Sequence, residues 1–596
     1  MKAYINNKEV EFTPGETILS VAKRNAVYIP TLCAYLPLDH TPGTCRVCLV
    51  EVDENGEKKV LPSCLTPLKE NMRVRTNTNE VRGLRRRQVQ WILADHNQDC
   101  ASCNRHGNCE LQDAALACGL KDNSMNGRYV ADRPIDASAN GLVLDASKCI
   151  RCGRCVEVCR QIQGVSALGF EGIGTETRAG IVGAKLWVDS KRCVQCGQCS
   201  LVCPVGAISE KDEIETALDW FNDPEIKTVI AFAPAVRVTL GEEFSFPQGL
   251  NVEKRIVTAL KALGADFVCD VNWAADVTIL EEGTEFIGRL KEHGTFPMMT
   301  SCCPGWINFV EKLNPEVIPN ISSTRSPQAI FGSLAKTYFA KKKGIDPKKL
   351  KFISIMPCTA KKDERTRDQL SKEGCPDTDL VLTVRELARL LKSQAVDLNE
   401  TPESEFDSPV MSENTGAAAI FGATGGVMEA ALRTVHAVLM KESMPDLNFT
   451  AVRGMQWLKE ASVDLGSYGT VRIAVVHGLN NAQKVVDEIK AGKSKYHFIE
   501  VMACPGGCIN GGGTARVKND YLARSATRMK GIYEIDEKRT LRESHKNPEV
   551  QTLYREFLGS PCSELSHELL HTHYKNKKTD EVAISIESLR DKIKLA

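Results

Sequence analysis

Two features that would point to a membrane or to a nucleic acid are missing from this sequence. Lysine and arginine together number 76, as do aspartate and glutamate, so no net charge favours nucleic acid or an anionic membrane as the main partner. No apolar run approaches the ~20 residues that a membrane span needs, and the opening segment lacks the apolar core of a secretory signal. We therefore expect a cytoplasmic protein without a membrane span.

A nucleotide-binding loop is missing as well. The glycine-rich segment INGGG at residues 509–513 lacks the Gly-Lys-Ser/Thr ending of a phosphate-binding loop. Its glycines instead predict a place where the backbone approaches a bound group closely. Any flavin or nicotinamide chemistry is therefore expected to belong to other subunits.

Cysteine, in contrast, is abundant, with 24 residues in a chain of 596. Most of these cysteines form short Cys-x2-Cys runs in a large chain, whereas disulfide frameworks are typical of small secreted domains. Metal binding is therefore the better interpretation. The length predicts roughly four or five folding units of ~100 to 200 residues each.

The cysteine groups and the pattern of apolar residues divide the chain into five parts. The first alternates apolar and polar residues like a small strand-rich domain, and the next two carry cysteine groups. The fourth is typical of α/β units around a buried, mostly parallel sheet, and the last predicts polar helices. The predicted ranges are residues 1–79, 80–140, 141–209, 220–535 and 540–596.

The first cysteine group lies in the strand-rich part. Cys33, Cys45, Cys48 and Cys64 supply four thiolates from loops, as a 2Fe-2S cluster in a ferredoxin-like fold requires. Their spacing looks more like the N-terminal domain of the large iron-sulfur subunit of respiratory complex I than like plant ferredoxins. A zinc site stays open as the alternative, because the spacing of four cysteines does not distinguish the metals.

The second group combines one histidine with three cysteines. Its members are His96, Cys100, Cys103 and Cys109. By spacing alone they could hold a 4Fe-4S cluster or zinc. We favour the cluster, because a similar run follows the 2Fe-2S domain in complex I. A neutral imidazole in place of a thiolate would raise the potential of that cluster.

The third group matches the repeat of bacterial two-cluster ferredoxins, in which the fourth cysteine of each run binds the other cluster. One predicted 4Fe-4S cluster has the ligands Cys149, Cys152, Cys155 and Cys203. The other has the ligands Cys193, Cys196, Cys199 and Cys159. Four clusters in series would conduct electrons without transforming a substrate, so the chemistry is expected in the α/β part.

Three further cysteine segments lie in the α/β part. They are TSCCPGW at residues 300–306, MPCTAKK at 356–362 and MACPGGC at 502–508. The second and third directly follow buried-strand patterns, at the carboxyl ends where open α/β sheets bind their ligands. The three segments resemble the signature motifs of FeFe hydrogenases. Together with the N-terminal cysteine groups, this resemblance covers nearly the whole chain.

The resemblance implies an H-cluster, a 4Fe-4S cube joined through one thiolate to a diiron unit with carbon monoxide, cyanide and a bridging dithiolate amine. By motif position, the cube ligands are Cys303, Cys358, Cys504 and Cys508, the last of which also bridges to the diiron unit. Other side chains must hold the rest of that unit. The expected contacts are Lys361 to a cyanide nitrogen, with Ala233, Pro234, Gln328, Met356 and Met502 around it.

Cys302 is the expected terminal proton donor and acceptor. If Cys303 binds the cube, its neighbour is free, and a thiol with a pKa near ~8.5 can exchange protons around neutral pH. The family's proton route would continue through Glu282, Ser322, Glu285 and Arg289. Glu282 and Glu285 share one face if their segment is helical. Without the resemblance, a solvated acidic helix start would be the default interpretation.

The sequence therefore predicts a multidomain FeFe hydrogenase catalytic subunit, with ferredoxin-like domains, an α/β catalytic domain and a helical tail. It would interconvert H2 with protons and electrons. The expected electron partners are ferredoxin or flavin-containing NAD(P)H diaphorase subunits, with an NAD(P)-linked hetero-oligomer favoured over a lone ferredoxin-dependent enzyme. A hydrogen sensor or a non-catalytic iron-sulfur assembly relative is less favoured, because Cys302, Glu282 and Lys361 are present.

Several residues outside these motifs have a plainer interpretation. Cys118, Cys269, Cys375 and Cys562 are expected to be buried or unreactive thiols. The tail histidines His567, His571 and His573 could form a metal site with Cys562. The tail, however, resembles the small-subunit region of FeFe hydrogenases, which wraps the catalytic domain without binding metal, and this is the favoured reading.

Overall fold

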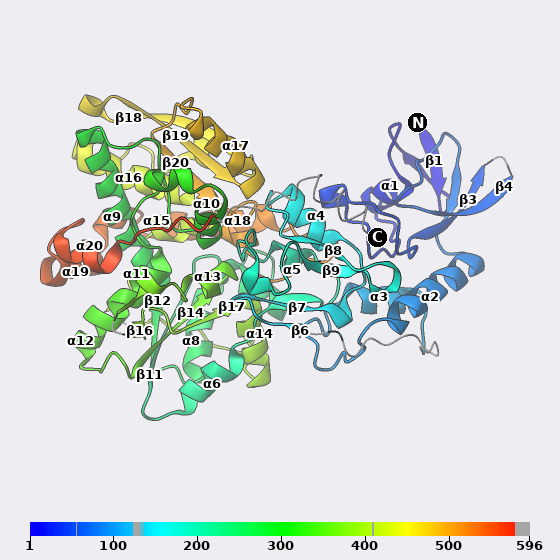
Figure 1. Cartoon of the computed structure of the whole chain (residues 1–596), viewed down its shortest axis with the longest axis horizontal. Coiled ribbons are helices and arrows are strands. Elements are labelled where there is room, and N and C mark those ends of the chain that lie inside the picture. Colours follow the sequence, from blue (N-terminus) through cyan, green and yellow to red (C-terminus); the bar gives the residue numbers. More distant parts are fainter. Residues whose placement is uncertain (55, 123–132, 134, 373, 408–409, 579–596) are drawn as a thin grey trace, which may run out of the picture.

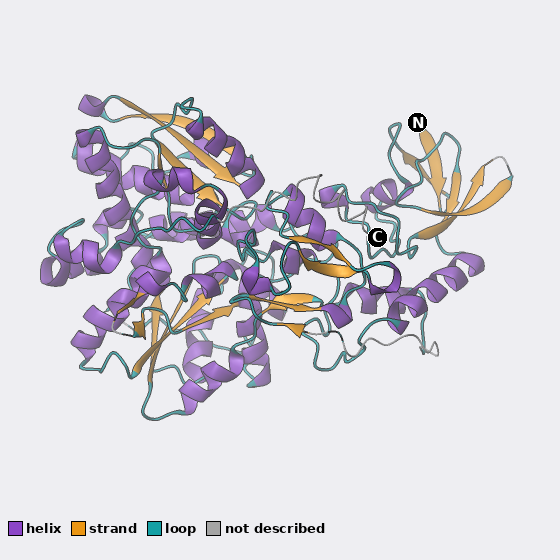
Figure 2. Ribbon diagram, in the orientation of Figure 1, coloured by secondary structure: helices purple, strands orange, loops and turns teal. Residues whose placement is uncertain are grey.

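The computed structural model describes residues 1–596 except 55, 123–132, 134, 373, 408–409 and 579–596. The α/β part forms a broad body, and the N-terminal units extend from one side of it (Figures 1 and 2). Among the described helices, none has the length and apolar character that crossing a membrane requires.

A five-stranded sheet forms the first unit. Its strand order is β2-β1-β5-β3-β4, in which only β1 and β5 pair in parallel. Alternate residues such as Ile5, Val50 and Val74 fill one core together with Cys48 and Cys64. The elements are β1 (Lys2–Ile5), β2 (Lys8–Glu11), α1 (Ile18–Arg24), β3 (Leu49–Glu54), β4 (Glu57–Pro62) and β5 (Arg73–Arg75).

The next two parts are helices and a ferredoxin-like fold. Strands β7 and β10 pair antiparallel although they stand at opposite ends of the third part, and this pairing brings its two cysteine runs together. Strand β6 joins the same sheet, although it lies in the range predicted for the preceding unit. The elements are α2 (Asn79–Ala94), α3 (Glu110–Ala117), β6 (Ile135–Asp136), β7 (Leu142–Asp145), α4 (Arg154–Gln161), β8 (Leu168–Glu171), β9 (Arg178–Ile181), α5 (Gln198–Val202) and β10 (Ile208–Glu210).

Two four-stranded sheets, and not the single sheet expected from the sequence, form the α/β part. The first has the order β12-β11-β14-β17 and is entirely parallel. The second has the order β13-β20-β19-β18, with β18 antiparallel at its edge. Buried strands of both sheets are similar apolar runs, so the sequence pattern does not reveal which strands pair. The strands are β11 (Lys227–Phe232), β12 (Phe267–Asp270), β13 (Met298–Met299), β14 (Leu350–Met356), β17 (Leu380–Thr383), β18 (Leu458–Asp464), β19 (Thr470–His477) and β20 (Phe498–Met502).

Helix α9 (Val271–Glu292) connects the cores of the two sheets (Figure 1). Asp270 caps its N-terminus by accepting a hydrogen bond from the backbone N–H of Asn272. Trp273, in the first turn, packs in the core of the first sheet, whereas Ile279 packs in the core of the second. One buried helix therefore touches both halves of the α/β part.

The other main helices of the α/β part surround these sheets. They are α6 (Ile214–Asn222), α8 (Glu253–Ala262), α10 (Pro304–Leu313), α11 (Pro327–Leu334), α13 (Ala360–Glu364), α14 (Val384–Ser393), α16 (Gly426–Met440), α17 (Leu479–Lys490) and α18 (Ser525–Lys538). Helix α14 begins with a capping box, in which the side chains of Thr383 and Glu386 each accept a backbone hydrogen bond from the other residue.

The C-terminal tail is helical only in part. It contains α19 (Pro548–Leu553) and α20 (Glu564–Leu570), but residues 571–578 contain no helix. The backbone N–H groups of Thr572 and Lys577 donate to carbonyls of Ser323 and Glu311, both at 2.8 Å. The two helices confirm the predicted helical tail, and the extended residues after them run along the α/β part. The last residues of the predicted tail, 579–596, lie outside the described residues.

Candidate active site

The carboxyl ends of strands from both sheets meet at one pocket. Strand β11 ends beside Ala233, β14 precedes Cys358, β20 precedes Cys504, and β13 leads to Cys302. The lining residues include Ala233, Pro234, Cys302, Cys303, Gln328, Met356, Cys358, Lys361, Met502, Cys504 and Cys508. The structure thus brings together all the residues that the resemblance assigned to the cube and to the diiron unit.

Four thiols of this pocket are close enough to influence one another's ionisation. Burial raises the pKa of Cys504 and Cys508, and the neighbouring cysteines raise both values further. The pKa of Cys358 is raised to about 12, first by burial and then by Cys303. Four neighbouring thiolates away from water require positive charge between them, which the iron ions of a cluster supply. This donor set fits a 4Fe-4S cube.

Lys361 is held at the pocket by a network that the sequence did not reveal. Its ammonium donates to Ser326 Oγ and to Glu364 Oε2, both at 2.8 Å, and to the carbonyl of Cys302 at 3.3 Å. Glu364 also accepts a hydrogen bond of 3.1 Å from Gln328 Nε2. Glu364 therefore positions both polar side chains, and its spacing three residues after Lys361 on a helix was the available signal.

The other predicted pocket residues line it without such a network. Met356 and Met502 are almost fully buried, and Ala233 lies at the end of β11. The Oε1 atom of Gln328 is buried and has no hydrogen-bond partner among the described residues. Unpartnered buried oxygens are uncommon in native proteins, so this atom is available for a bound group.

The surroundings of both Cys302 and Glu282 favour the protonated form of each side chain. Burial, with Glu282 as the next cause, raises the pKa of Cys302 well above its usual value, in contrast to the unperturbed thiol expected from the sequence. Neither carboxylate oxygen of Glu282 has a hydrogen-bond partner among the described residues. Burial and then the nearby Glu285 raise the pKa of Glu282 to about 8. Because Glu282 is only 1% exposed within α9, a solvated acidic helix start is excluded.

Ser322, Glu285 and Arg289 form a connected chain beyond this pair. Ser322 Oγ donates to one carboxylate oxygen of Glu285 at 2.8 Å, and Arg289 donates to the other at 2.7 Å. The side chain of Arg289 is 17% exposed. Hydrogen bonds therefore join three of the predicted proton-route residues, from the buried Ser322 through Glu285 to the partly exposed Arg289.

The ferredoxin-like part holds two groups of four cysteines. Cys149, Cys152, Cys155 and Cys203 line one pocket, as predicted for one cluster. In the other predicted set, burial raises the pKa of Cys199, followed by the effects of Cys196, Cys193 and Cys159. Both groupings match the exchange of the fourth cysteine between the two runs.

The two outer ligand sets also fit metal centres. His96 is buried, and its Nδ1 has no hydrogen-bond partner among the described residues. Burial lowers the pKa of His96 to about 4, so its imidazole is neutral and can bind a metal. In the first unit, Cys33 lies within hydrogen-bonding reach of Cys45, and Cys48 within reach of Cys64.

The ferredoxin-like part packs directly against the strand-end pocket. Thr359 Oγ1, next to Cys358, donates to the carbonyl of Gln195 at 2.7 Å. A Cβ atom on Gly512 would lie 2.3 Å from the carbonyl oxygen of Cys196, so only glycine allows this approach. The glycine run thus lets the backbone meet the Cys196 loop of the neighbouring domain, which brings the second predicted cluster beside the pocket.

The outer units both contact the first predicted ferredoxin cluster. In the first unit, the ring Nε2 of His40 lies 2.8 Å from the carbonyl oxygen of Cys152. In the second, the N–H of Glu110 donates to the carbonyl of Pro204, next to Cys203, at 3.0 Å. Both outer units therefore lie against the loops that carry ligands of the first predicted cluster, a feature that the sequence did not indicate.

Comparison with known families covers nearly the whole chain. Residues 226–512 match the C-terminal domain of the iron only hydrogenase large subunit, and residues 523–577 match the iron hydrogenase small subunit. The N-terminal matches are a 2Fe-2S iron-sulfur cluster binding domain at residues 1–79, the NADH-ubiquinone oxidoreductase-G iron-sulfur binding region at 85–124 and a 4Fe-4S dicluster domain at 148–207.

Individual relatives are similar over their full length. The chain is 41% identical to the NADP-reducing hydrogenase subunit HndD of Solidesulfovibrio fructosivorans, over 96% of this chain and 98% of that protein. This chain belongs to the FeFe hydrogenase family. The hydrogenase is also 39% identical to iron hydrogenase 1 of Clostridium pasteurianum, over 96% of this chain and 100% of that protein. A solved FeFe hydrogenase structure from Chlamydomonas reinhardtii is 38% identical, with a TM-score of 0.56, and covers 62% of this chain and 100% of its own. These matches confirm the predicted family, enzyme class and domain types.

Three further residues of the hydrogenase lie beside the predicted proton route. The N–H of Ser323 donates to Glu285 at 3.1 Å, and its hydroxyl lies 2.8 Å from His571 Nδ1. Tyr574 donates its hydroxyl to the carbonyl of Ser322 at 3.3 Å. His571 and Tyr574 belong to the tail, so no motif spacing in the α/β part could indicate that they reach this place.

Proposed function

We propose that this hydrogenase interconverts H2 with protons and electrons at an H-cluster bound in the strand-end pocket. The observation that carries the proposal is the meeting of Cys302 and the unpartnered Glu282 with four further cysteines at that pocket. A proton-carrying thiol and carboxyl beside a cluster-type donor set suit a reaction that consumes protons and electrons together.

The cofactor would be held by side chains that already line the pocket. Cys303, Cys358, Cys504 and Cys508 would hold the cube, and Cys508 would also hold the diiron unit. When bound, the diiron unit supplies the metal chemistry of H–H bond formation and cleavage. Lys361, fixed by Ser326 and Glu364, would offer its ammonium to a cyanide ligand of that unit. Ala233, Pro234, Met356 and Met502 exclude water, and Gln328 offers its free Oε1.

The protein moves protons between this pocket and solvent. Cys302 donates or accepts a proton at Sγ, and Glu282 restores or removes it through its carboxyl group, which is protonated below about pH 8. Ser322 and Glu285 continue the route to Arg289 at the edge of the protein. Each of these groups except Arg289 can both bind and release a proton. Arg289 instead fixes the carboxylate of Glu285 beside it.

Electrons travel through one 2Fe-2S and three 4Fe-4S clusters. The ligand sets are those of the four N-terminal groups, with His96 as the single imidazole ligand. The Cys196 loop delivers electrons to the cube, because it packs against Thr359 and Gly512 beside the cube ligands. The two outer clusters exchange electrons with the cluster at Cys152 and Cys203.

The electron partners are flavin-containing NAD(P)H diaphorase subunits in a hetero-oligomer. The similarity to a subunit of an NADP-reducing hydrogenase supports this assignment, as does the match of residues 85–124 to an NADH-ubiquinone oxidoreductase region. A lone ferredoxin-dependent enzyme is the alternative, which purification of the native complex would distinguish by its subunit content.

The decisive experiment is H2 evolution from reduced viologen by anaerobic protein whose diiron unit is confirmed by infrared spectroscopy. We expect fast evolution by the parent and a loss of at least ~100-fold in Cys302→Ala, because a positioned proton donor contributes roughly 10² to 10⁴-fold. The matched control is Cys375→Ala, a half-buried cysteine outside the pocket, which should keep full activity. A silent but fully loaded parent would refute the proposed function.

A further inference from the structure

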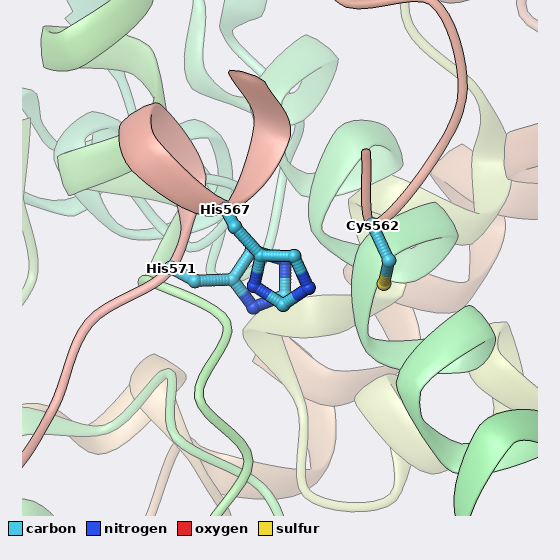
Figure 3. Close-up of side chains that lie close together, drawn as sticks. All are labelled: Cys562, His567 and His571. Carbon is cyan, nitrogen blue, oxygen red and sulfur yellow. The ribbon is translucent and has the colours of Figure 1, made fainter. Parts of the chain in front are cut away.

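Three potential metal ligands gather in the tail, away from the H-cluster pocket and the iron-sulfur groups (Figure 3). The ligand atoms of Cys562, His567 and His571 all lie within 4.8 Å of one another. His567 stands on α20, and His571 follows the helix four residues later, so the two imidazoles project from one side. In Figure 3 the two rings overlap in the view, and Cys562 lies to their right on a separate segment.

The backbone of Cys562 adopts an uncommon conformation. Its φ of 56° lies in the left-handed region, which is uncommon for a residue with a side chain. Its N–H donates to Glu281 Oε2 at 2.7 Å. The contact with a buried carboxylate holds an unfavourable backbone conformation in place, one residue before the cap of α20.

His571 is fixed by oxygen atoms on both ring nitrogens. Nδ1 lies 2.8 Å from Ser323 Oγ, and Nε2 lies 3.1 Å from Glu281 Oε2. If a metal bound one ring nitrogen of His571, the other nitrogen would keep its hydrogen bond to an oxygen. Such a hydrogen bond orients most metal-binding histidines. Tyr554 donates to the second oxygen of Glu281 at 2.6 Å and keeps the carboxylate in position.

A purely structural role explains His571, and also Cys562, whose thiol donates to the carbonyl of Glu281 at 3.5 Å, but it does not explain His567. Among the described residues, the exposed imidazole of His567 has no hydrogen-bond partner, and its contact is the ring of His571, with centroids 4.2 Å apart. An exposed imidazole is free to point into solvent, where it is fully hydrated. Its position over a buried histidine, beside a thiol, places three soft or borderline ligands around one point.

We propose that Cys562, His567 and His571 bind one Zn²⁺ ion. One thiolate and two imidazoles are donors that zinc prefers, and the spacing of three residues between the histidines is common in zinc sites. Water, or the carboxylate of Glu281, completes the tetrahedron. His573, which was grouped with these residues on sequence alone, is exposed and lies outside the cluster.

The test uses the full-length, iron-loaded protein dialysed anaerobically against buffer with micromolar free Zn²⁺, and then against buffer without zinc. We expect about one zinc atom per chain by mass spectrometry in the parent and in His573→Ala, which is the matched control. His567→Ala and Cys562→Ala should lose zinc affinity at least ~10-fold. Substituting the exposed His567 carries little risk of misfolding, and circular dichroism of each variant checks the fold.

X-ray absorption at the zinc edge identifies the ligands without interference from iron. We expect one sulfur at ~2.3 Å and two nitrogens at ~2.0 to 2.1 Å in the parent. Zinc that had entered an iron-sulfur site would show mostly sulfur ligands and would persist in His567→Ala. That result, or equal zinc content in the parent and both ligand variants, would overturn the proposal.

Discussion

The N-terminal units and the catalytic domain assemble their cysteines in different ways. In the ferredoxin-like part, each run of ligands sits on one loop and one short helix, α4 or α5. In the catalytic domain, the predicted ligands follow strands of two different sheets, from Cys303 to Cys508. The first kind of site takes three ligands from one local run and one from the other run, whereas the second takes its ligands from segments spread over the whole domain.

The surroundings differ as well. The catalytic pocket has the buried, unpartnered Glu282 beside it, and a helix shared by both sheets holds that residue in place. The N-terminal sites conduct electrons and need no acid. The comparison therefore predicts that single changes near the pocket stop turnover, whereas changes in the N-terminal units reduce it.

The largest effect is expected from Glu282→Gln. Removal of the carboxyl that most strongly raises the pKa of Cys302 should lower H2 evolution from reduced viologen by roughly 10² to 10⁴-fold, the usual contribution of a positioned acid or base. Infrared bands of the cofactor should be unchanged. Glu292→Gln, at the exposed end of the same helix, is the matched control and should stay fully active. Unchanged activity in Glu282→Gln would place the proton route elsewhere.

The second effect is a pH dependence of stability. The pKa of Glu282 rises from an ordinary 4.5 to about 8 on folding, so its contribution to stability is fully present below about pH 4.5 and is lost as pH rises toward 8. Between pH 5 and pH 8 the parent should lose stability relative to Glu282→Gln. The measurement is the calorimetric melting temperature of the two proteins across that pH range. The same dependence of melting temperature on pH in both proteins would contradict the prediction.

A smaller effect is expected at the contact between the two regions. Gly512→Ala would place a Cβ atom 2.3 Å from the carbonyl oxygen of Cys196, so we expect a destabilisation of about 1 to 3 kcal/mol. Gly83→Ala, in the open interior of α2, is the control and should be neutral or slightly stabilising. Thermal unfolding followed by circular dichroism compares the two variants. Equal melting temperatures would mean that the backbone at Gly512 does not closely contact the Cys196 loop.

The smallest effect is expected at His96. His96→Ala should remove one ligand of an outer cluster and lower partner-driven turnover only a few-fold, because a second outer unit reaches the same cluster. Viologen-driven turnover should change less than NAD(P)H-driven turnover in the native complex. A complete loss of partner-driven activity would show that all electrons pass through the His96 site, and so would favour a single series.

The sequence predicted the local sites better than the distributed ones. The ferredoxin ligands follow from spacing, and the pocket ligands follow from the resemblance, because each motif carries its own cysteine. Spacing could not reveal that the strands form two sheets or that His571 reaches Ser323. These features depend on contacts between segments far apart in the chain, which leave no local pattern. The burial that raises the pKa of Cys302 also depends on the folded domain and leaves no local pattern in the sequence.

The meeting of two outer units at Cys152 and Cys203 has a kinetic consequence. In the proposed path, electrons from either entrance would share the remaining steps, through the Cys196 loop to the pocket. The total rate of electron transfer is then set by the shared segment. The fraction of electrons that comes from each donor is set by the two outer units. Two electron donors of different potential can thus compete for the same shared clusters. A change at either outer unit then has a larger effect on the choice of donor than on the rate of H2 formation.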